Sequence, residues 1–326
     1  MPKTNAIAMF TKDTHVEILT HYKSNEEAAK AYNDKLGWNQ PVVYRQMVAY
    51  WRKLYTEYEG KKGAMVKQEK EFVKLVQPSP TDDIGDTDVP AMCHRILVIG
   101  DLHAPYTHPD AIAFLRHVRD SYKPDMAVQV GDETDGHAIS FHDSDVNLDS
   151  AGVELEKAKK VLAKVHDLFP NLLVCDSNHG SLVYRRAKAH GLPVQFIKKY
   201  RDILFPEHGA KKWSWADAWV LNTQLGPVRF QHQVGGDLLL TAAHERMSMV
   251  IGHHHALYDI KYAASSSALY FGAHAGCLID NKSLAFAYGK LSKGKPIMGV
   301  MTITDGCPSL VPMLLDSEGR WVGRKK

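Results

Sequence analysis

Short continuous apolar runs alternate with amphipathic stretches along the chain from Arg95 onward. Continuous apolar runs are typical of strands buried on both faces, whereas apolar residues spaced three or four positions apart are typical of helices. The pattern predicts strands, with the polar residues that end them, at 95–101, 125–132 and 171–179, separated by helices at 108–120 and 151–169. This alternation predicts a parallel sheet layered with helices, and therefore an α/β fold class.

Further strand-like runs follow at 228–233 and 247–253. The segments 268–279 and 298–305 are also apolar, and we expect them to add antiparallel strands.

A change of composition divides the chain. Residues 77–90 are rich in Pro, Asp, Thr and Gly and show no apolar period, so we interpret residues 77–92 as a linker. The chain then consists of an N-terminal region, residues 1–76, and a larger region, residues 93–326.

The N-terminal region contains two helical patterns separated by a glycine. Ser24 and Glu27 form a capping box at the start of the first pattern. This region has 13 lysines and arginines against 9 carboxylates, and the second pattern places basic residues beside aromatic ones: Arg45, Arg52 and Lys53. A glycine turn followed by a basic, aromatic helix is typical of a helix-turn-helix DNA reader. The alternative is a small helical domain that packs on the larger region or mediates dimerisation.

Composition and segment hydrophobicity indicate where in the cell the protein is expected. The chain has 326 residues, of which 44% are hydrophobic and 24% charged, with a formal net charge of +3. No apolar run approaches the roughly 18 residues of a membrane span, and the N-terminal residues lack the apolar core of a signal peptide. The four cysteines are scattered without a C-x-x-C pair, which argues against a disulfide scaffold or a thiolate zinc site. We therefore expect a cytoplasmic protein with no membrane partner.

Metal-ligating residue types follow five of the predicted strands. They occur in the stretches Asp101-Leu-His103, Gly131-Asp132, Ser177-Asn178-His179, His232 and Gly252-His253-His254-His255. The carboxyl ends of parallel strands lie at one edge of a sheet, so residues far apart in the sequence converge on one pocket. Carboxylate, imidazole and amide oxygen are ligands of Mn²⁺, Fe and Zn²⁺. The five stretches therefore predict a metal site.

The order D-x-H, G-D, N-H, H and G-H-x-H resembles the calcineurin-like metallophosphoesterase superfamily, over roughly Arg95 to His255. The resemblance implies a layered α/β/β/α sandwich, to which the N-terminal region would add a small helical domain. It also implies two divalent metal ions. The first would be bound by Asp101, His103 and His255, the second by Asn178, His232 and His253, with Asp132 bridging them. Mn²⁺ is the expected metal, and Fe, Zn²⁺, Ni and Mg²⁺ are the alternatives, because these ligands suit several metals.

The same resemblance implies that the protein is a metal-dependent phosphoesterase. Two adjacent cations stabilise the attacking and the leaving oxygen of an in-line displacement at phosphorus, and they activate a water molecule as the nucleophile. In such a site His179 would not bind metal but would donate a proton to the leaving oxygen as general acid. His254, between two ligands, should point away from the metals, because side chains alternate along an extended chain.

Two residues depart from the family pattern. Gly180 stands where the family usually has an acidic residue that orients the catalytic histidine, so the partner of His179 is open; Asp176 or another carboxylate could take this role. Ser177 replaces a glycine at a position that supplies turn geometry. Asp135 either supports the ligands or belongs to a solvated turn.

Within the superfamily, the chain looks most like compact members of the repair-nuclease branch, including versions found in bacteriophage genomes. Together with the basic N-terminal helices, this favours a phosphodiesterase that acts on nucleic acid, and a DNA nuclease in particular. One alternative is a phosphomonoesterase or a small-nucleotide phosphohydrolase. Another is a DNA-binding protein without catalysis. The expected location is the cytoplasm, or the host cytoplasm if the protein is viral.

Overall fold

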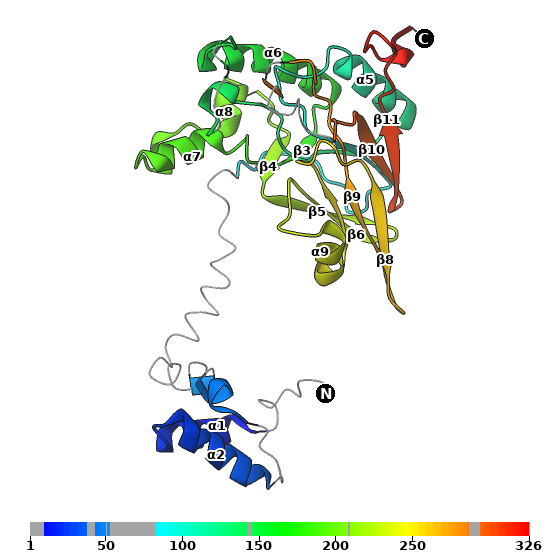
Figure 1. Ribbon diagram of the computed structural model, residues 1–326. Coiled ribbons are helices and arrows are strands. Elements are labelled where there is room, and N and C mark those ends of the chain that lie inside the picture. Colours follow the sequence, from blue (N-terminus) through cyan, green and yellow to red (C-terminus); the bar gives the residue numbers. More distant parts are fainter. Residues whose placement is uncertain are drawn as a thin grey trace. The chain divides into compact units, whose positions relative to one another are not determined.

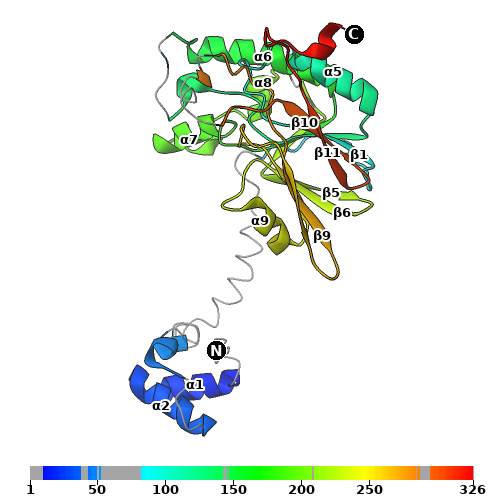
Figure 2. The same ribbon diagram turned by 45° about the vertical axis from the view of Figure 1, so that its right-hand side comes forward.

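The computed structural model describes residues 10–37, 43–49, 51–52, 82–141, 145, 147–207, 209–283, 285–286 and 294–325. The chain forms two compact units, Met1–Gln77 and Pro78–Lys326. Each unit has its own apolar core. Figures 1 and 2 show the elements of both units.

The first sheet of the larger unit has the strand order β11-β10-β1-β2-β3-β4. Its parallel strands are β1 (Arg95–Ile99), β2 (Met126–Gln129), β3 (Leu172–Cys175) and β4 (Trp213–Ala216). β10 (Gly299–Thr304) pairs antiparallel with β1, as predicted, and β11 (Cys307–Pro312) pairs antiparallel with β10. All residues of β2 and β3 are buried, which explains their continuous apolar sequences.

The second sheet has the order β5-β6-β7-β9-β8. Its strands are β5 (Ala218–Thr223), β6 (Gly226–Gln231), β7 (Ser248–Ile251), β8 (Ile260–Ala264) and β9 (Leu269–His274). The prediction that β9 is an antiparallel addition is wrong for its contact with β7, because those two strands are parallel. The sequence did not predict β8, a partly exposed edge strand without an apolar run. β8 runs back antiparallel to β9, so the hairpin between them returns β9 in the direction of β7.

Helices cover the outer face of each sheet, and Figures 1 and 2 show the four layers α/β/β/α that the resemblance implies. α5 (Ala111–Tyr122) and α6 (Ala151–Leu168) pack on the first sheet, and α9 (Leu238–Glu245) packs on the second. Leu97 and Ile99 of β1 face the helices, whereas Ile96 and Val98 face the second sheet. This alternation buries both faces of the first sheet.

Shorter helices lie in the connections. They are η2 (His137–Ile139), α7 (Leu182–Ala189), η3 (Val194–Phe196), α8 (Tyr200–Leu204) and η5 (Val322–Lys325). None of the helices in the described ranges is long and apolar enough to cross a membrane.

Residues 82–92, predicted as the C-terminal part of the linker, form a strap along the edge of the first sheet. Asp83 and Trp215 exchange two main-chain hydrogen bonds of 3.0 and 3.1 Å. The N–H of Asp86 donates to Lys211 O at 2.8 Å. This part is therefore fixed to the larger unit, because the free edge of β4 satisfies its backbone. Residues 77–81 of the predicted linker lie outside the described residues.

The smaller unit contains α1 (Lys12–His21), α2 (Asn25–Leu36) and helical residues at 45–49 and 51–52. The prediction that Ser24 caps α2 is confirmed, but its Oγ accepts from the N–H of Glu26 and not from that of Glu27, the residue of the predicted capping box. Gly37 ends the helix with a φ of 63°. The sequence did not predict α1, which buries only Ile18 and Leu19 of its apolar residues. These two residues complete the core of the unit.

Candidate metal centre

The polar residues that follow strands of both sheets meet in one place. Asp101 follows β1, Asp132 follows β2 and Asn178 follows β3, whereas His232 and His253 follow β6 and β7 of the second sheet. The backbones of three residues in these loops have a positive φ: His103 (47°), Asp132 (54°) and His253 (67°). Residues other than glycine seldom adopt this conformation, and those that do cluster at functional sites.

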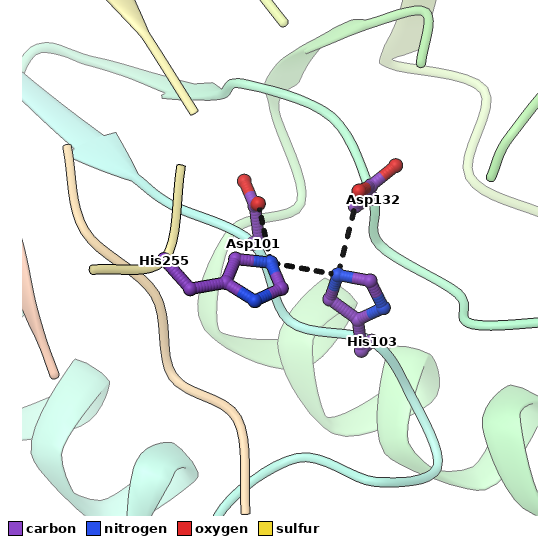
Figure 3. A group of neighbouring side chains, drawn as sticks. All are labelled: Asp101, His103, Asp132 and His255. Carbon is purple, nitrogen blue, oxygen red and sulfur yellow. Dashed lines mark hydrogen bonds and ion pairs between the residues drawn. The ribbon is translucent and has the colours of Figure 1, made fainter. Parts of the chain in front are cut away.

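The first ligand set comprises Asp101, His103, Asp132 and His255, and their ligand atoms lie within 4.8 Å of one another. Figure 3 shows the set. His255 Nε2 lies 2.9 Å from Asp101 Oδ2 and 3.1 Å from His103 Nε2. His103 Nε2 in turn lies 3.3 Å from Asp132 Oδ2. Two imidazole nitrogens and two carboxylates therefore face one small volume, which is the donor chemistry of a divalent cation site.

The second ligand set lies on the other side of Asp132. Asp132, His232 and His253 have their ligand atoms within 4.8 Å of one another. His232 Nε2 lies 2.7 Å from Asn178 Oδ1 and 3.2 Å from His253 Nδ1. The same Asp132 Oδ2 that faces His103 is also 3.3 Å from His232 Nε2. The structure thus brings all seven predicted ligands together, with Asp132 between the two sets.

The site buries several carboxylates, whose negative charge a bound cation would balance. Asp101, Asp132 and Asp135 are at most 3% exposed, and histidines are their ion-pair partners in the part of the chain that the structure describes. Burial works against protonation of His103, but Asp132 and Asp135 overcome it and raise the pKa of its imidazole to about 10. Burial also lowers the pKa of His232, but the nearby Asp132 carboxylate outweighs burial and raises this pKa to about 9. A bound divalent ion would supply the positive charge that these buried carboxylates otherwise draw from protons.

Two glycines of the motifs make room for the ligands. A Cβ at Gly252 would lie 2.2 Å from Asp101 Oδ1, and a Cβ at Gly131 would lie 2.7 Å from His232 Nδ1. Neither position admits a side chain without moving a ligand. The G-D and G-H-x-H motifs therefore need glycine for close packing against the opposite ligand set.

His179 lies beside both sets and its side chain is 21% exposed. Its Nδ1–H donates to the main-chain carbonyl of Asp135, and its ring packs edge-on against His103 with centroids 4.6 Å apart. The Asp135 carboxylate lies 3.8 Å from the same Nδ1. The partner that orients His179 is thus the main-chain carbonyl of Asp135. The position of Gly180 is confined, because a Cβ there would lie 3.1 Å from Ser177 Oγ.

Three groups support the ligands from behind. Asp135 Oδ1 lies 2.6 Å from His103 Nδ1, so Asp135 supports a ligand and does not belong to a solvated turn. The carbonyl of Val130 lies 2.9 Å from His232 Nδ1. Ser177 Oγ accepts from the N–H groups of Asp132 and Gly180, each at 2.9 Å. The sequence signal for Ser177 was its departure from the family glycine, but its role as a tie between two loops was missed.

His254 lies outside both ligand sets and is exposed. Its ring is 5.0 Å from that of His253 and 5.8 Å from that of His274. The outer two of the three consecutive histidines therefore lie at the centre, and the middle one lies outside both ligand sets.

The predicted nucleic-acid contacts belong to the smaller unit. Arg45 has a side chain that is 66% exposed, 3.6 Å from Glu26. The Arg52 guanidinium donates to Leu19 O and Tyr22 O, each at 2.7 Å, and to Asn25 Oδ1 at 3.0 Å. Arg52 therefore ties helices of the unit together, and Lys53 lies outside the described residues.

Comparisons with known proteins give three similar solved structures of low sequence identity. Among solved structures, Yfce, a phosphoesterase from E. coli, is 11% identical, with 70% of this chain and 97% of that chain covered and a TM-score of 0.38. Vacuolar protein sorting 29 of Cryptosporidium parvum is 13% identical, with 68% and 96% covered and a TM-score of 0.33. A metallophosphoesterase from Sphaerobacter thermophilus is 13% identical, with 68% and 88% covered and a TM-score of 0.36.

No curated protein matches the chain in sequence. The model of the calcineurin-like phosphoesterase family matches residues 94–275, which is more than half of the chain and contains every ligand described above. The fold, the ligand sets and this match lead to the same conclusion: the chain belongs to the calcineurin-like phosphoesterase family and is a metal-dependent phosphoesterase.

Proposed function

We propose that the protein is a dinuclear phosphodiesterase, and a DNA nuclease in particular, with Mn²⁺ as its metal. The observation that carries the proposal is the position of Asp132, whose Oδ2 lies 3.3 Å from an imidazole nitrogen of each ligand set. Two ions held there would stabilise the charge that develops on the phosphoryl group and activate a water molecule.

The chain's own residues position the reaction. His179 donates Nδ1–H to the carbonyl of Asp135, so Nε2 is left to hold the proton that passes to the leaving oxygen. The main-chain N–H of His179 donates to Asp132 Oδ1 at 3.2 Å. This hydrogen bond keeps the general acid next to the carboxylate that lies between the two ligand sets.

The smaller unit supports a nucleic-acid substrate. Arg45 and Tyr44 are exposed, at 66% and 54%, at the start of the helical residues 45–49. An exposed arginine and an aromatic ring on one helix suit phosphate and base contacts. We also propose Lys53, which lies outside the described residues, as a nucleic-acid contact. We propose that this unit holds DNA as a helix-turn-helix element does.

The test is a panel with the purified full-length chain and Mn²⁺, Mg²⁺ or Zn²⁺. The substrates are bis-p-nitrophenyl phosphate, p-nitrophenyl phosphate, single-stranded DNA and duplex DNA. We expect hydrolysis of the bis-ester and of DNA, fastest with Mn²⁺, and none with Asp132→Asn, which controls for a contaminating nuclease. Much faster hydrolysis of the mono-ester would indicate a phosphomonoesterase. Binding of DNA without turnover of any substrate would indicate a non-catalytic protein.

The tethering role of the smaller unit has its own test. Deletion of residues 1–78 removes one core and leaves the other cores intact. We expect DNA affinity to fall while hydrolysis of bis-p-nitrophenyl phosphate is retained. The affinity of the full chain should also fall steeply with salt, because phosphate contacts release counterions. Equal DNA affinity with and without residues 1–78 would exclude this role.

A further inference from the structure

The segment that follows the loop of Asn178 and His179 is strongly basic. Between Asp176 and Asp202 there are six lysines and arginines and no carboxylate, whereas the whole chain balances 40 basic residues with 37 acidic ones. We call residues 182–201, from α7 to the start of α8, the basic segment. It begins directly after the loop with Asn178 and His179, and α7 lies at the margin of the larger unit in Figures 1 and 2.

Half of these cations lie at the surface. Arg185, Lys188 and Lys198 are exposed, and none forms an ion pair with a carboxylate of the described ranges. The other three are held by main-chain carbonyls or by the carboxylate of Asp83 in the strap: Arg186, Lys199 and Arg201. Exposed lysines and arginines that pair with no carboxylate are available for phosphate groups.

Apolar side chains are exposed between these cations. Phe196 is 77% exposed, the highest value among the exposed large apolar residues in the described part of the chain, and Leu192 is 49% exposed. A hollow of about 230 Å³ borders the segment and is lined by Tyr184 and Lys198, and also by Asp82 and Asp83 of the strap. It reaches Gly180, the neighbour of His179. Solvent-exposed aromatic rings beside cations are what a nucleic-acid strand with unstacked bases requires.

A hydrogen bond connects the basic segment to the metal centre. Arg185 Nη1 donates to the carbonyl of Asn178, one of the predicted ligands, at 3.1 Å. The same guanidinium lies 4.8 Å from the centroid of the Phe141 ring, which is 48% exposed. An arginine of the basic segment therefore contacts both a residue of the second ligand set and an exposed aromatic ring.

We propose that the basic segment binds a single-stranded stretch of nucleic acid and leads it to the metal centre. This rests on the proposed function, whose nucleic-acid substrate it makes more specific. The cations would contact backbone phosphates, and Phe196 would stack on a base. A duplex fits less well, because its bases are stacked on one another and offer no free face to an exposed ring. The occupant is therefore an unpaired strand or a frayed end.

Binding of a fluorescent single-stranded thymidine oligonucleotide tests the proposal. Phosphorothioate linkages keep it intact in the presence of the metal-loaded, full-length protein. We expect Lys188→Glu/Lys198→Glu to bind at least tenfold more weakly at low salt. The slope of log affinity against log salt should become shallower by about 1.4, because each lost phosphate contact on a single strand contributes about 0.7. Phe196→Ala, which changes no charge, should bind roughly tenfold more weakly at every salt concentration.

The matched control is Lys160→Glu/Lys164→Glu, which makes the same charge change at two exposed positions of α6. It should bind nearly as the wild type does. All variants should hydrolyse bis-p-nitrophenyl phosphate normally, which shows that the metal centre is intact. Wild-type oligonucleotide affinity in both the double variant and Phe196→Ala would overturn the proposal, even if the protein cleaves DNA. A wild-type protein that hydrolyses the bis-ester but neither binds nor cleaves DNA would instead overturn the proposed function.

Discussion

The Nδ1 atom of His103 lies 2.6 Å from Oδ1 of Asp135, and both side chains are buried. Because Nδ1–H donates to this carboxylate, the lone pair of a neutral imidazole is left on Nε2. Nε2 is the atom that faces Asp132 and His255. A fixed tautomer and ring orientation are what a metal-binding histidine needs, so Asp135 is a positioning residue of the centre.

Asp135→Ala should therefore lower metal affinity by about 10- to 100-fold. Asp135→Asn should lower it less, because the amide oxygen can still accept from Nδ1–H. The hydrogen bond from His179 to the Asp135 carbonyl is retained in both variants. Metal content after dialysis against defined free Mn²⁺ measures the effect, and equal occupancy in all three proteins would contradict the positioning role.

Ser177 ties the loop of Asp132 to the loop of His179. Its hydroxyl oxygen accepts two N–H groups, and the residue is 6% exposed. Ser177→Ala should lower the free energy of unfolding by about 1–3 kcal/mol, because it leaves buried donors unpaired. Ser267→Ala, in the exposed turn between β8 and β9, is the control and should change it by less than about 0.5 kcal/mol. Urea denaturation of the three proteins gives the comparison.

His179 should be needed for turnover and not for metal binding. It lies beside the ligand sets, and its Nδ1–H is used by the Asp135 carbonyl. His179→Asn should retain the metal content of the wild type and lower kcat by about 10²- to 10⁴-fold. Asp132→Asn should instead lose metal and activity together. Unchanged activity in His179→Asn would show that another group donates the proton.

The three consecutive histidines should respond differently to substitution. His254→Ala should change kcat and metal content by no more than a few-fold, because His254 is exposed and outside both ligand sets. His253→Ala and His255→Ala each remove a side chain that lies in one set and should lose most of the bound metal. Metal loss in His254→Ala comparable to that of its neighbours would contradict this assignment.

The sequence predicted the parts of the fold that have a strong apolar signal. The buried strands β1, β2 and β3 and the helices α5 and α6 fall within about four residues of their expected positions. The edge strand β8 has neither a continuous apolar run nor a strict alternation, so nothing in its composition distinguishes it from a loop. β8 reverses the chain before β9, so β9 runs parallel to β7. The prediction of an antiparallel strand was wrong because β8 was not predicted.

The predicted ligands came together because each lies in the short stretch that follows a strand, and strand ends are fixed by the sheets. Residues that act through the backbone could not be found in this way. The partner of His179 is a carbonyl group, which every residue has, so no side-chain type marks it. Arg52 looked like a nucleic-acid contact because charge is visible in a sequence, whereas the carbonyls of Leu19 and Tyr22 that bind it are not.

The C-terminal segment is fastened to α5 by a charge pair whose strength depends on pH. Arg320 donates two hydrogen bonds to the carboxylate of Asp110, which precedes α5, and the N–H of Trp321 donates a third at 2.9 Å. The hydrogen bond from Arg320 is the main reason that the pKa of Asp110 falls from its ordinary value of 3.8 to about 2. The folded state therefore binds its proton less tightly than the unfolded state. This contribution to stability is complete above about pH 4 and is lost as the pH falls toward 2.

Arg320→Met removes the guanidinium and leaves the Asp110 carboxylate with the N–H of Trp321. The free energy of unfolding of the larger unit should fall at pH 7, and only by a modest amount, because the Arg320 side chain is 45% exposed. The difference from the wild type should shrink as the pH is lowered from 4 toward 2, where Asp110 becomes protonated in both proteins. Urea denaturation followed by tryptophan fluorescence at several pH values measures it. A difference that stays constant over this range would show that Arg320 stabilises the segment by packing and not through the charge of Asp110.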